Sequence, residues 1–117
     1  MTRKPLLFLK DILNAIKRIE SYTNCGREEF LKNPSLQDAT LFRLQTIGEA
    51  VNQLPDELKV KYPEIPWRQI VGFRNMLAHV YWQVDLTTVW AILKPQGELQ
   101  ELKEVVVKLI DDISPEL

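Results

Sequence analysis

Residues 65–81 read IPWRQIVGFRNMLAHVY, and no other part of the chain says as much about its fold. Placed on a helix at about 100° per residue, the apolar side chains of this stretch fall on two flanks. One flank carries Trp67, Ile70, Val71, Leu77, Ala78 and Tyr81, and the other carries Phe73, Met76 and Val80. Pro66 suits the first helical position, because proline has a fixed φ and no N–H that needs a partner. A helix that is apolar on two flanks is expected to lie between its own core and a further surface, such as a second subunit.

Helical spacing continues along the rest of the chain. Apolar residues recur every three or four positions in three further segments, 9–19, 44–54 and 99–113. Ser35 and Asp38, after Pro34, predict a capping box at the start of the helix that contains 44–54. Shorter helices are expected over 27–31 and from Asp85, as the cap, through residue 90, with a helical turn inside the connection 55–63. Since no segment alternates with a period of two, the predicted fold is all-α.

The predicted architecture is an antiparallel, up-and-down bundle of four to five main helices, in a single domain over residues 1–117. With 45% hydrophobic and 26% charged residues, the composition argues against disorder. The apolar run 6–9 is too short for a membrane span or a signal peptide. Cys25 is the single cysteine and His79 the single histidine, so neither an internal disulfide nor a four-ligand zinc site is expected. We therefore expect a cytoplasmic protein with no membrane partner and no metal site.

Charge is distributed unevenly along the chain. The formal net charge is −1 and the pI about 5.8, which excludes a strongly basic nucleic-acid-coating protein. Five basic and two acidic side chains lie within residues 1–20, whereas three basic and six acidic ones lie from residue 93 onward. Such asymmetry suits docking to another protein at least as well as binding to RNA.

The segment 74–79 contains the residues that are most suggestive of chemistry. Arginine binds phosphate through a planar fork of donors, and histidine can transfer protons near neutral pH. Arg74 and His79 therefore form a minimal set for metal-free cleavage of a phosphodiester. A narrow polar strip runs between the two apolar flanks and is made of Arg68, Gly72, Asn75 and His79. Gly72 is expected to permit close approach of a neighbouring helix or a phosphate next to His79.

Structural interpretations of the same residues remain open. Arg74 interrupts an apolar flank, so it must find a partner or stay hydrated, and Glu49 or another acid across the bundle could pair with it. A single histidine on a helix can also be structural or merely exposed. The three tryptophans, Trp67, Trp82 and Trp90, could stack on bases, although packing is the better interpretation for Trp67 and Trp90.

The stretch 65–81, together with Ile47-Gly48-Glu49-Ala50-Val51, closely resembles the HepT family. HepT proteins are small HEPN-domain ribonuclease toxins of MntA–HepT toxin–antitoxin systems, in which the toxin is paired with a nucleotidyltransferase. The HEPN signature is an arginine, usually a polar residue next, and a histidine a few positions on. Here these are Arg74, Asn75 and His79, and Tyr81 matches the tyrosine of the HepT form. The resemblance covers nearly the whole chain, including the first helix and the segment 85–90.

This resemblance implies a HEPN-like helical fold and a homodimer with a composite cleft that cleaves RNA. It implies that Arg74 and His79 are the catalytic residues. It also implies a cognate MntA-like nucleotidyltransferase antitoxin that adenylylates Tyr81 and so silences the toxin. The chain itself would need no cofactor, because the ATP and magnesium for that reaction would belong to the active site of the antitoxin.

The residues themselves also favour a dimer. Cleavage of RNA without a metal needs a base, an acid and a cation that stabilises the developing charge, yet one chain has one imidazole. Positions five apart lie about 140° apart around a helix, so Arg74 and His79 do not converge on one phosphate. A two-fold interface would supply two copies of each group. We expect Arg74 to bind phosphate, His79 to transfer protons, and Asn75 to support them by orienting the ring or the phosphate.

Two other functions fit the same sequence. The chain could be a non-catalytic helical subunit that binds nucleotide or substrate for a small nucleotidyltransferase, with Arg74 holding nucleotide phosphate. It could also be an inert oligomerisation bundle in which the segment 74–79 is structural.

Overall fold

The computed structural model describes residues 3–114, and all regular structure in this part of the chain is helical. Seven α-helices and one 3₁₀ turn follow one another as α1 Pro5–Thr23, α2 Arg27–Lys32, α3 Pro34–Gln53, α4 Asp56–Lys59, α5 Trp67–His79, η1 Tyr81–Gln83, α6 Leu86–Leu93 and α7 Glu98–Ile113. The predicted all-α class is confirmed. The four long helices α1, α3, α5 and α7 are the main elements, in agreement with the expected number.

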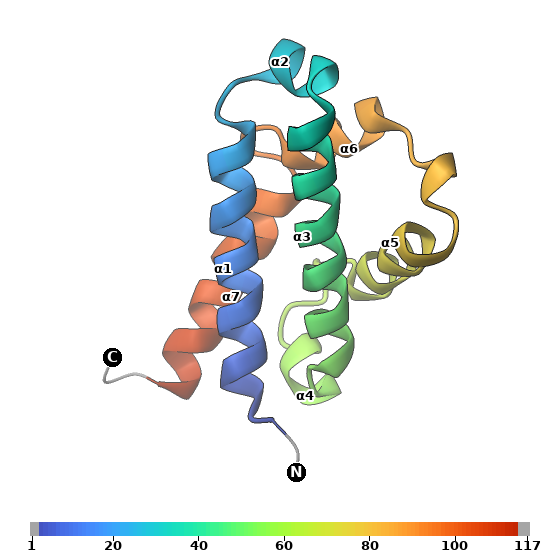
Figure 1. The fold of residues 1–117 in the computed structure, drawn as a ribbon. Helices are drawn as coiled ribbons and strands as arrows, with labels where there is room; N and C mark the ends of the chain where they lie inside the picture. Colours follow the sequence, from blue (N-terminus) through green and yellow to red (C-terminus); the bar gives the residue numbers. More distant parts are fainter. Residues whose placement is uncertain (1–2, 115–117) are drawn as a thin grey trace.

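The long helices do not all run up and down. α1 lies between α3 and α7 and packs on both, and each of these runs antiparallel to it (Figure 1). α5 packs on α3 but lies across it rather than along it (Figure 1). The expectation of a simple up-and-down bundle is therefore wrong for α5. The short connections on both sides of α5 turn it outward, so that one side of this helix faces away from the bundle.

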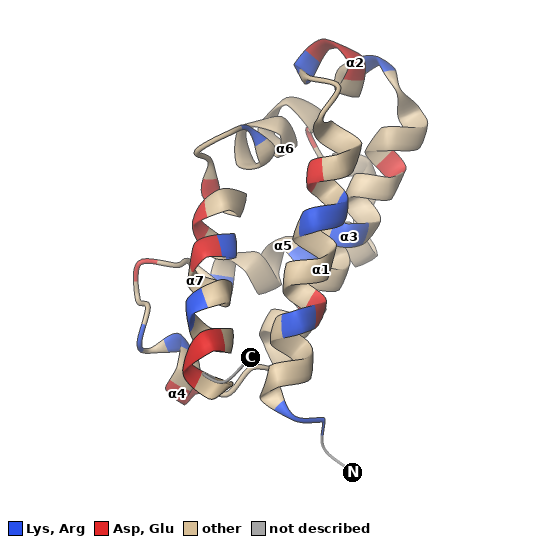
Figure 2. Ribbon diagram, turned by 90° about the vertical axis from the view of Figure 1, so that its left-hand side faces the viewer, with Lys and Arg blue, Asp and Glu red and all other residues tan. Residues whose placement is uncertain are grey.

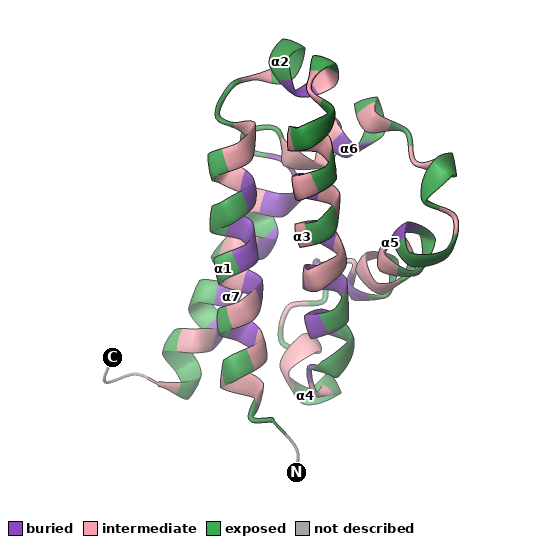
Figure 3. Ribbon diagram, in the orientation of Figure 1, coloured by how far each residue is buried: buried purple, intermediate pink, exposed green. Residues whose placement is uncertain are grey.

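A continuous apolar core joins α1, α3 and α7. Figure 3 shows buried segments along the inner sides of these helices and exposed ones on their outer sides. Seven apolar side chains of the core, spread over α1, α3 and α7, have no exposed surface: Leu9, Ile12, Ile16, Ile19, Val51, Val106 and Leu109. Fully burying a side chain of this size contributes roughly 1.5–3 kcal/mol, so the core is the main source of stability. The stripe predicted for 99–113 ends early, because Ile113 is 40% exposed.

Aromatic side chains attach the shorter elements to this core. Phe30 is the only buried residue of α2, and its ring lies 5.4 Å from that of Trp90 in α6. The Trp67 indole N–H donates to the carbonyl oxygens of Lys59 and Tyr62, at 3.1 and 3.0 Å, and so ties α5 to the preceding connection. These contacts confirm the packing interpretation for Trp67 and Trp90.

One of the two predicted helix caps is confirmed. The Asp85 side chain accepts a hydrogen bond from the Thr87 backbone N–H at 3.0 Å, so it caps α6 as expected. The capping box of Ser35 and Asp38 is wrong, because the cap of α3 lies two residues earlier, at Asn33, and the helix begins at Pro34. The Asn33 side chain accepts from the Leu36 N–H at 3.2 Å. Proline suits the first turn, where no N–H partner is needed, and this moves the helix start toward the N-terminus.

The end of α5 also differs from the prediction. The helix ends at His79, and Val80 leaves the helical region with φ −138° and ψ 44°. Tyr81 therefore lies in η1 and does not continue the apolar flank of α5. Tyr81 and Trp82 are both 67% exposed, so no burial of apolar surface stabilises another helical turn.

Charged residues are unevenly divided between α1 and α7. Red segments predominate on α7, whereas blue ones lie along α1 (Figure 2). Lys103 of α7 bridges this boundary, since its Nζ lies 2.9 and 3.0 Å from the two carboxylate oxygens of Glu20 in α1. Among residues 3–114, no helix combines the length and the apolar character that crossing a membrane requires.

Candidate functional site

The outer side of α5 carries the polar strip that the sequence predicted. Arg68, Gly72, Asn75 and His79 are all exposed, as expected from their positions on the helix. His79 is the last residue of α5, so the strip ends where the chain turns into η1. The His79 side chain is exposed, and its imidazole forms no hydrogen bond with any of residues 3–114.

Arg74 lies outside the polar strip, on the side of α5 that packs against α3. Its side chain is only 31% exposed. Its Nη2 lies 3.0 Å from the Glu49 carboxylate, and its Nη1 donates to the Asn75 side-chain oxygen at 2.9 Å. Its Nε is buried and has no hydrogen-bond partner within the described chain. The pairing with Glu49 is one of the partners that the sequence left open, and it explains how a charge is accommodated on this flank.

The close approach between helices occurs at Gly48 rather than at Gly72. A Cβ added at Gly48 would overlap the Cβ of Arg74 and would lie 3.3 Å from the Ile70 carbonyl oxygen. A Cβ added at Gly72 would meet nothing within 4 Å. No helix of the described chain approaches Gly72, which faces open space, and close approach of a phosphate there stays a prediction. The sequence signal that was missed is a glycine inside an apolar helical stripe, which often marks close backbone approach.

The structure separates the two candidate catalytic residues of a single chain. Arg74 is directed at α3, whereas His79 is exposed at the end of α5. Asn75, which was expected to orient the ring or the phosphate, directs its side-chain oxygen at Arg74 instead. One chain therefore presents a positioned guanidinium and a free imidazole at two different places on α5.

Tyr81 and Trp82 follow directly after His79. Their rings lie 5.7 Å apart in an edge-to-face arrangement, and both side chains point largely into solvent. Tyr81 was expected on the apolar flank that Trp67 begins, which would require α5 to continue past His79. Because the helix ends there, Tyr81 lies beside the His79 end of the strip instead.

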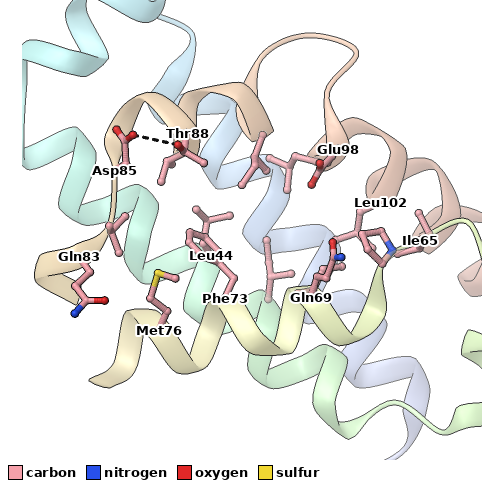
Figure 4. A pocket seen from close by; sticks show the side chains of 17 residues that line it. Leu44, Ile65, Gln69, Phe73, Met76, Gln83, Asp85, Thr88, Glu98 and Leu102 are labelled. Atoms are coloured by element: carbon pink, nitrogen blue, oxygen red, sulfur yellow. Dashed lines mark hydrogen bonds between the residues drawn. The ribbon is translucent and has the colours of Figure 1, made fainter. Parts of the chain in front are cut away.

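Three hollows border α5, and the two that adjoin Arg74 and the second apolar flank differ in character. A polar one of about 320 Å³ is lined by Arg74 and Glu49 together with Arg3 and Asp11, whose own ion pair measures 2.7 Å. A larger and mainly apolar groove of about 430 Å³ lies between α3, α5, α6 and α7 (Figure 4). Phe73 and Met76 line this groove, so the second apolar flank of α5 faces it and stays partly open. Neither Arg74 nor His79 belongs to the groove lining.

The groove has a polar end. Asp85 and Thr88 meet there through a hydrogen bond of 3.2 Å, drawn in Figure 4. Hydrogen bonds from the side chain and the backbone N–H of Thr87 keep the pKa of Asp85 below its ordinary value. These interactions stabilise the start of α6, so the carboxylate has a structural role.

The arrangement around α5 is suited to phosphate chemistry. The Arg74 guanidinium is held by two acceptors yet opens into a polar hollow, and a guanidinium is well matched to phosphate oxygens. The exposed imidazole of His79 can accept or donate a proton.

Comparison with known proteins agrees with this chemistry. The family described as Ribonuclease HepT-like matches residues 12–109. A protein of Methanocaldococcus jannaschii named as a candidate RNase is 40% identical over 107 residues, which cover 91% of this chain and 87% of that protein. A protein of Thermococcus cleftensis named "Probable ribonuclease HepT" is 35% identical over 111 residues, covering 89% of this chain and 100% of the relative.

A third relative, from Caldanaerobacter subterraneus subsp. tengcongensis, is also named as a candidate RNase and is 37% identical over 109 residues. These residues cover 91% of this chain and 97% of that relative. No solved structure matches the chain significantly. The family match extends from α1 to α7 and includes the whole of α5 and η1. The chain therefore belongs to the HepT-like ribonuclease family.

Proposed function

We propose that this protein is a metal-independent endoribonuclease that acts as the toxin of a toxin–antitoxin system. The observation that carries the proposal is the arrangement on α5. A guanidinium anchored by Glu49 and an exposed imidazole lie within one segment of a chain of the HepT-like ribonuclease family. The polar strip of α5 is open to solvent, so a phosphodiester backbone can approach along it.

Arg74 and His79 have distinct roles in the proposed reaction. Attack of the ribose 2′-oxygen on phosphorus forms a new P–O bond, and the bond to the 5′-oxygen of the next nucleotide breaks. One imidazole accepts the 2′-hydroxyl proton, and a second, protonated imidazole gives a proton to the leaving oxygen. The Arg74 guanidinium stabilises the charge that builds up on the phosphoryl oxygens. Asn75 supports this step by holding Nη1 of Arg74.

The second imidazole would come from a second copy of the chain. In one chain Arg74 faces α3 and the imidazole of His79 stands alone, so a two-fold interface along α5 would complete the set. Apolar surface is available beside the strip for such an interface, since Met76 is 37% exposed and borders the apolar groove. Homodimerisation through this surface is part of the proposal.

Tyr81 is the proposed site of control. It is 67% exposed and lies two residues after His79, so a nucleotidyltransferase antitoxin could reach its hydroxyl. Transfer of AMP from ATP would join the tyrosine oxygen to the α-phosphorus and release pyrophosphate. The added phosphate and nucleoside would repel and obstruct RNA beside the strip. ATP and magnesium would be bound by the antitoxin.

The test is incubation of the purified protein with RNA in the presence of EDTA. The wild type should cleave, whereas Arg74→Ala and His79→Ala should each lower the rate by at least about 100-fold, as expected for loss of charge stabilisation or proton transfer. Circular dichroism should show that both variants stay folded. Intact RNA at every protein concentration would contradict the proposal. Dependence of a partner's transferase activity on this chain would then favour a binding subunit.

A further inference from the structure

We propose that Glu49 is a positioning residue for RNA cleavage, whose carboxylate holds the Arg74 guanidinium in the orientation that meets the phosphate. This inference rests on the proposed function. The contact that carries it joins α3 to α5: Nη2 of Arg74 lies 3.0 Å from Oε1 of Glu49, between residues 25 positions apart. Both residues line the same polar hollow, so the contact lies where a phosphate has access.

The hydrogen bonds of Arg74 leave a defined set of free donors. A guanidinium has five N–H groups, two on each terminal nitrogen and one on Nε. One N–H of Nη2 is used by Glu49 and one N–H of Nη1 by Asn75. Nε is buried, so its N–H cannot reach a ligand in the hollow. One N–H on each terminal nitrogen remains, and these two are the donors that can bind a phosphate.

The backbone around Glu49 makes this contact possible. Gly48 has no side chain, and the Cβ of Arg74 occupies the space beside it. α3 and α5 can therefore approach closely at this point, which places the next residue, Glu49, beside the guanidinium. The stem of Arg74 is fixed by packing on Gly48 and its head by Glu49 and Asn75. Without Glu49 the head would keep only the neighbouring Asn75 as a partner.

The expected effects on stability and on catalysis differ greatly in size. The Glu49 side chain is 55% exposed and that of Arg74 is 31% exposed, so their ion pair is well hydrated and should contribute little to the free energy of unfolding. Catalysis is more sensitive, because displacing a catalytic group by about 1 Å can lower the rate by about 100-fold. A positioning role therefore predicts a large loss of turnover in a protein that melts almost normally.

Glu49 should also affect RNA binding in the opposite direction from catalysis. Its carboxylate partly neutralises Arg74 and repels phosphate, so removing the charge should leave RNA binding unchanged or make it tighter. A variant that merely disturbs the fold would weaken binding and turnover together. The sign of the change in KM therefore separates positioning from a structural role.

The experiment compares Glu49→Gln and Glu49→Ala with wild type, using a fluorogenic RNA substrate and thermal melting. Glu28→Gln is the matched control, since Glu28 is an exposed acid on α2, outside the residues that line the polar hollow. We expect kcat to fall by at least tenfold in Glu49→Ala and by less in Glu49→Gln, whose amide oxygen can still accept a hydrogen bond. KM should not rise, and the melting temperature should stay close to that of wild type.

Several results would overturn the inference. A kcat of Glu49→Ala within twofold of wild type would remove the positioning role, as would a rise in KM accompanied by a large drop in melting temperature. An equal loss in Glu28→Gln would show a general effect of surface charge. A wild-type protein that does not cleave RNA would refute the proposed function itself and the inference with it, whereas active wild type with unaffected Glu49 variants would refute the inference alone.

Discussion

At the scale of single residues, two glycines on neighbouring helices have opposite surroundings. Gly48 of α3 is buried against the Cβ of Arg74, whereas Gly72 of α5 is exposed and has no atom nearby where its side chain would be. Both cost helical stability relative to alanine, by about 1 kcal/mol each. Only at Gly48 is that cost offset by a contact between helices, because the absent side chain lets Arg74 approach.

Substitution of the two glycines should therefore have opposite effects on stability. Gly48→Ala places a Cβ where Arg74 already lies, and we expect a loss of about 1–3 kcal/mol in the free energy of unfolding, as for other overpacked sites. Gly72→Ala should gain about 0.5–1 kcal/mol, because the new methyl group meets open space in the interior of a helix. Urea unfolding followed by circular dichroism measures both. A stabilised Gly48→Ala would show that α3 and α5 are less closely packed than described.

At the scale of elements, the segment from α5 to α6 is determined by how one helix ends and the next begins. α5 ends at His79, η1 carries two exposed aromatic residues, and Asp85 caps α6. This order places His79 at a helix end and Tyr81 in a surface turn. His79 and Tyr81, which are only two residues apart in sequence, therefore belong to different elements.

The cap of α6 should make stability depend on pH. Hydrogen bonds from Thr87 keep the pKa of Asp85 below its ordinary value in the folded protein. A depressed folded pKa contributes stability above the ordinary value, near pH 4, and that contribution is lost as the pH falls through the lower folded value. We expect Asp85→Ala to melt at a lower temperature than wild type at pH 7, with the difference shrinking below about pH 4. A difference that is the same at pH 7 and at pH 3 would contradict this.

The exposed turn η1 can be tested by fluorescence. Trp82 is 67% exposed, whereas Trp67 is 9% exposed and Trp90 packs on Phe30. Acrylamide should therefore quench the emission of Trp82 much more strongly than that of the other two tryptophans. We expect the variant Trp82→Phe to lose most of the readily quenched emission, with Trp90→Phe as the comparison. Equal quenching in both variants would mean that Trp82 is covered in solution, as at a subunit interface.

At the scale of the whole molecule, the proposed reaction needs more than one chain supplies. The single imidazole lies at the end of α5, while the guanidinium is held against α3. The exposed apolar surface along α5, beside Met76, suits an interface between two copies. The two subunits of a dimer could share one cleft or carry one independent site each. These two arrangements predict different cleavage rates for a dimer in which only one subunit is altered.

A mixed dimer distinguishes these cases. Wild-type and His79→Ala chains that carry different tags can be co-expressed and purified through both tags in turn. With one shared cleft that needs two imidazoles, the mixed dimer should lose at least about 100-fold in rate, because either the acid or the base is missing. A mixed dimer with half the wild-type activity would show two independent sites. The doubly tagged wild-type dimer is the control.

Features that depend on residues close in sequence could be predicted from the sequence alone. The all-α class, the polar strip of α5 and the Asp85 cap follow from helical periodicity and from hydrogen bonds between near neighbours. The starts of α3 and α5 and the end of α5 were misplaced by one or two residues; Pro66, expected as the first residue of α5, is its cap. At such ends several local hydrogen bonds compete with one another, and burial selects among them.

The partner of Arg74 and the role of Gly48 were decided only by the tertiary structure. Several acids could have paired with Arg74, and the choice of Glu49 depends on how α3 and α5 cross, which brings together residues 25 positions apart. Crossing of helices is set by packing over the whole core, whereas the helices themselves are set by patterns within a few residues. The sequence by itself therefore determined which residues carry the chemistry, and the fold determined how Arg74 is held.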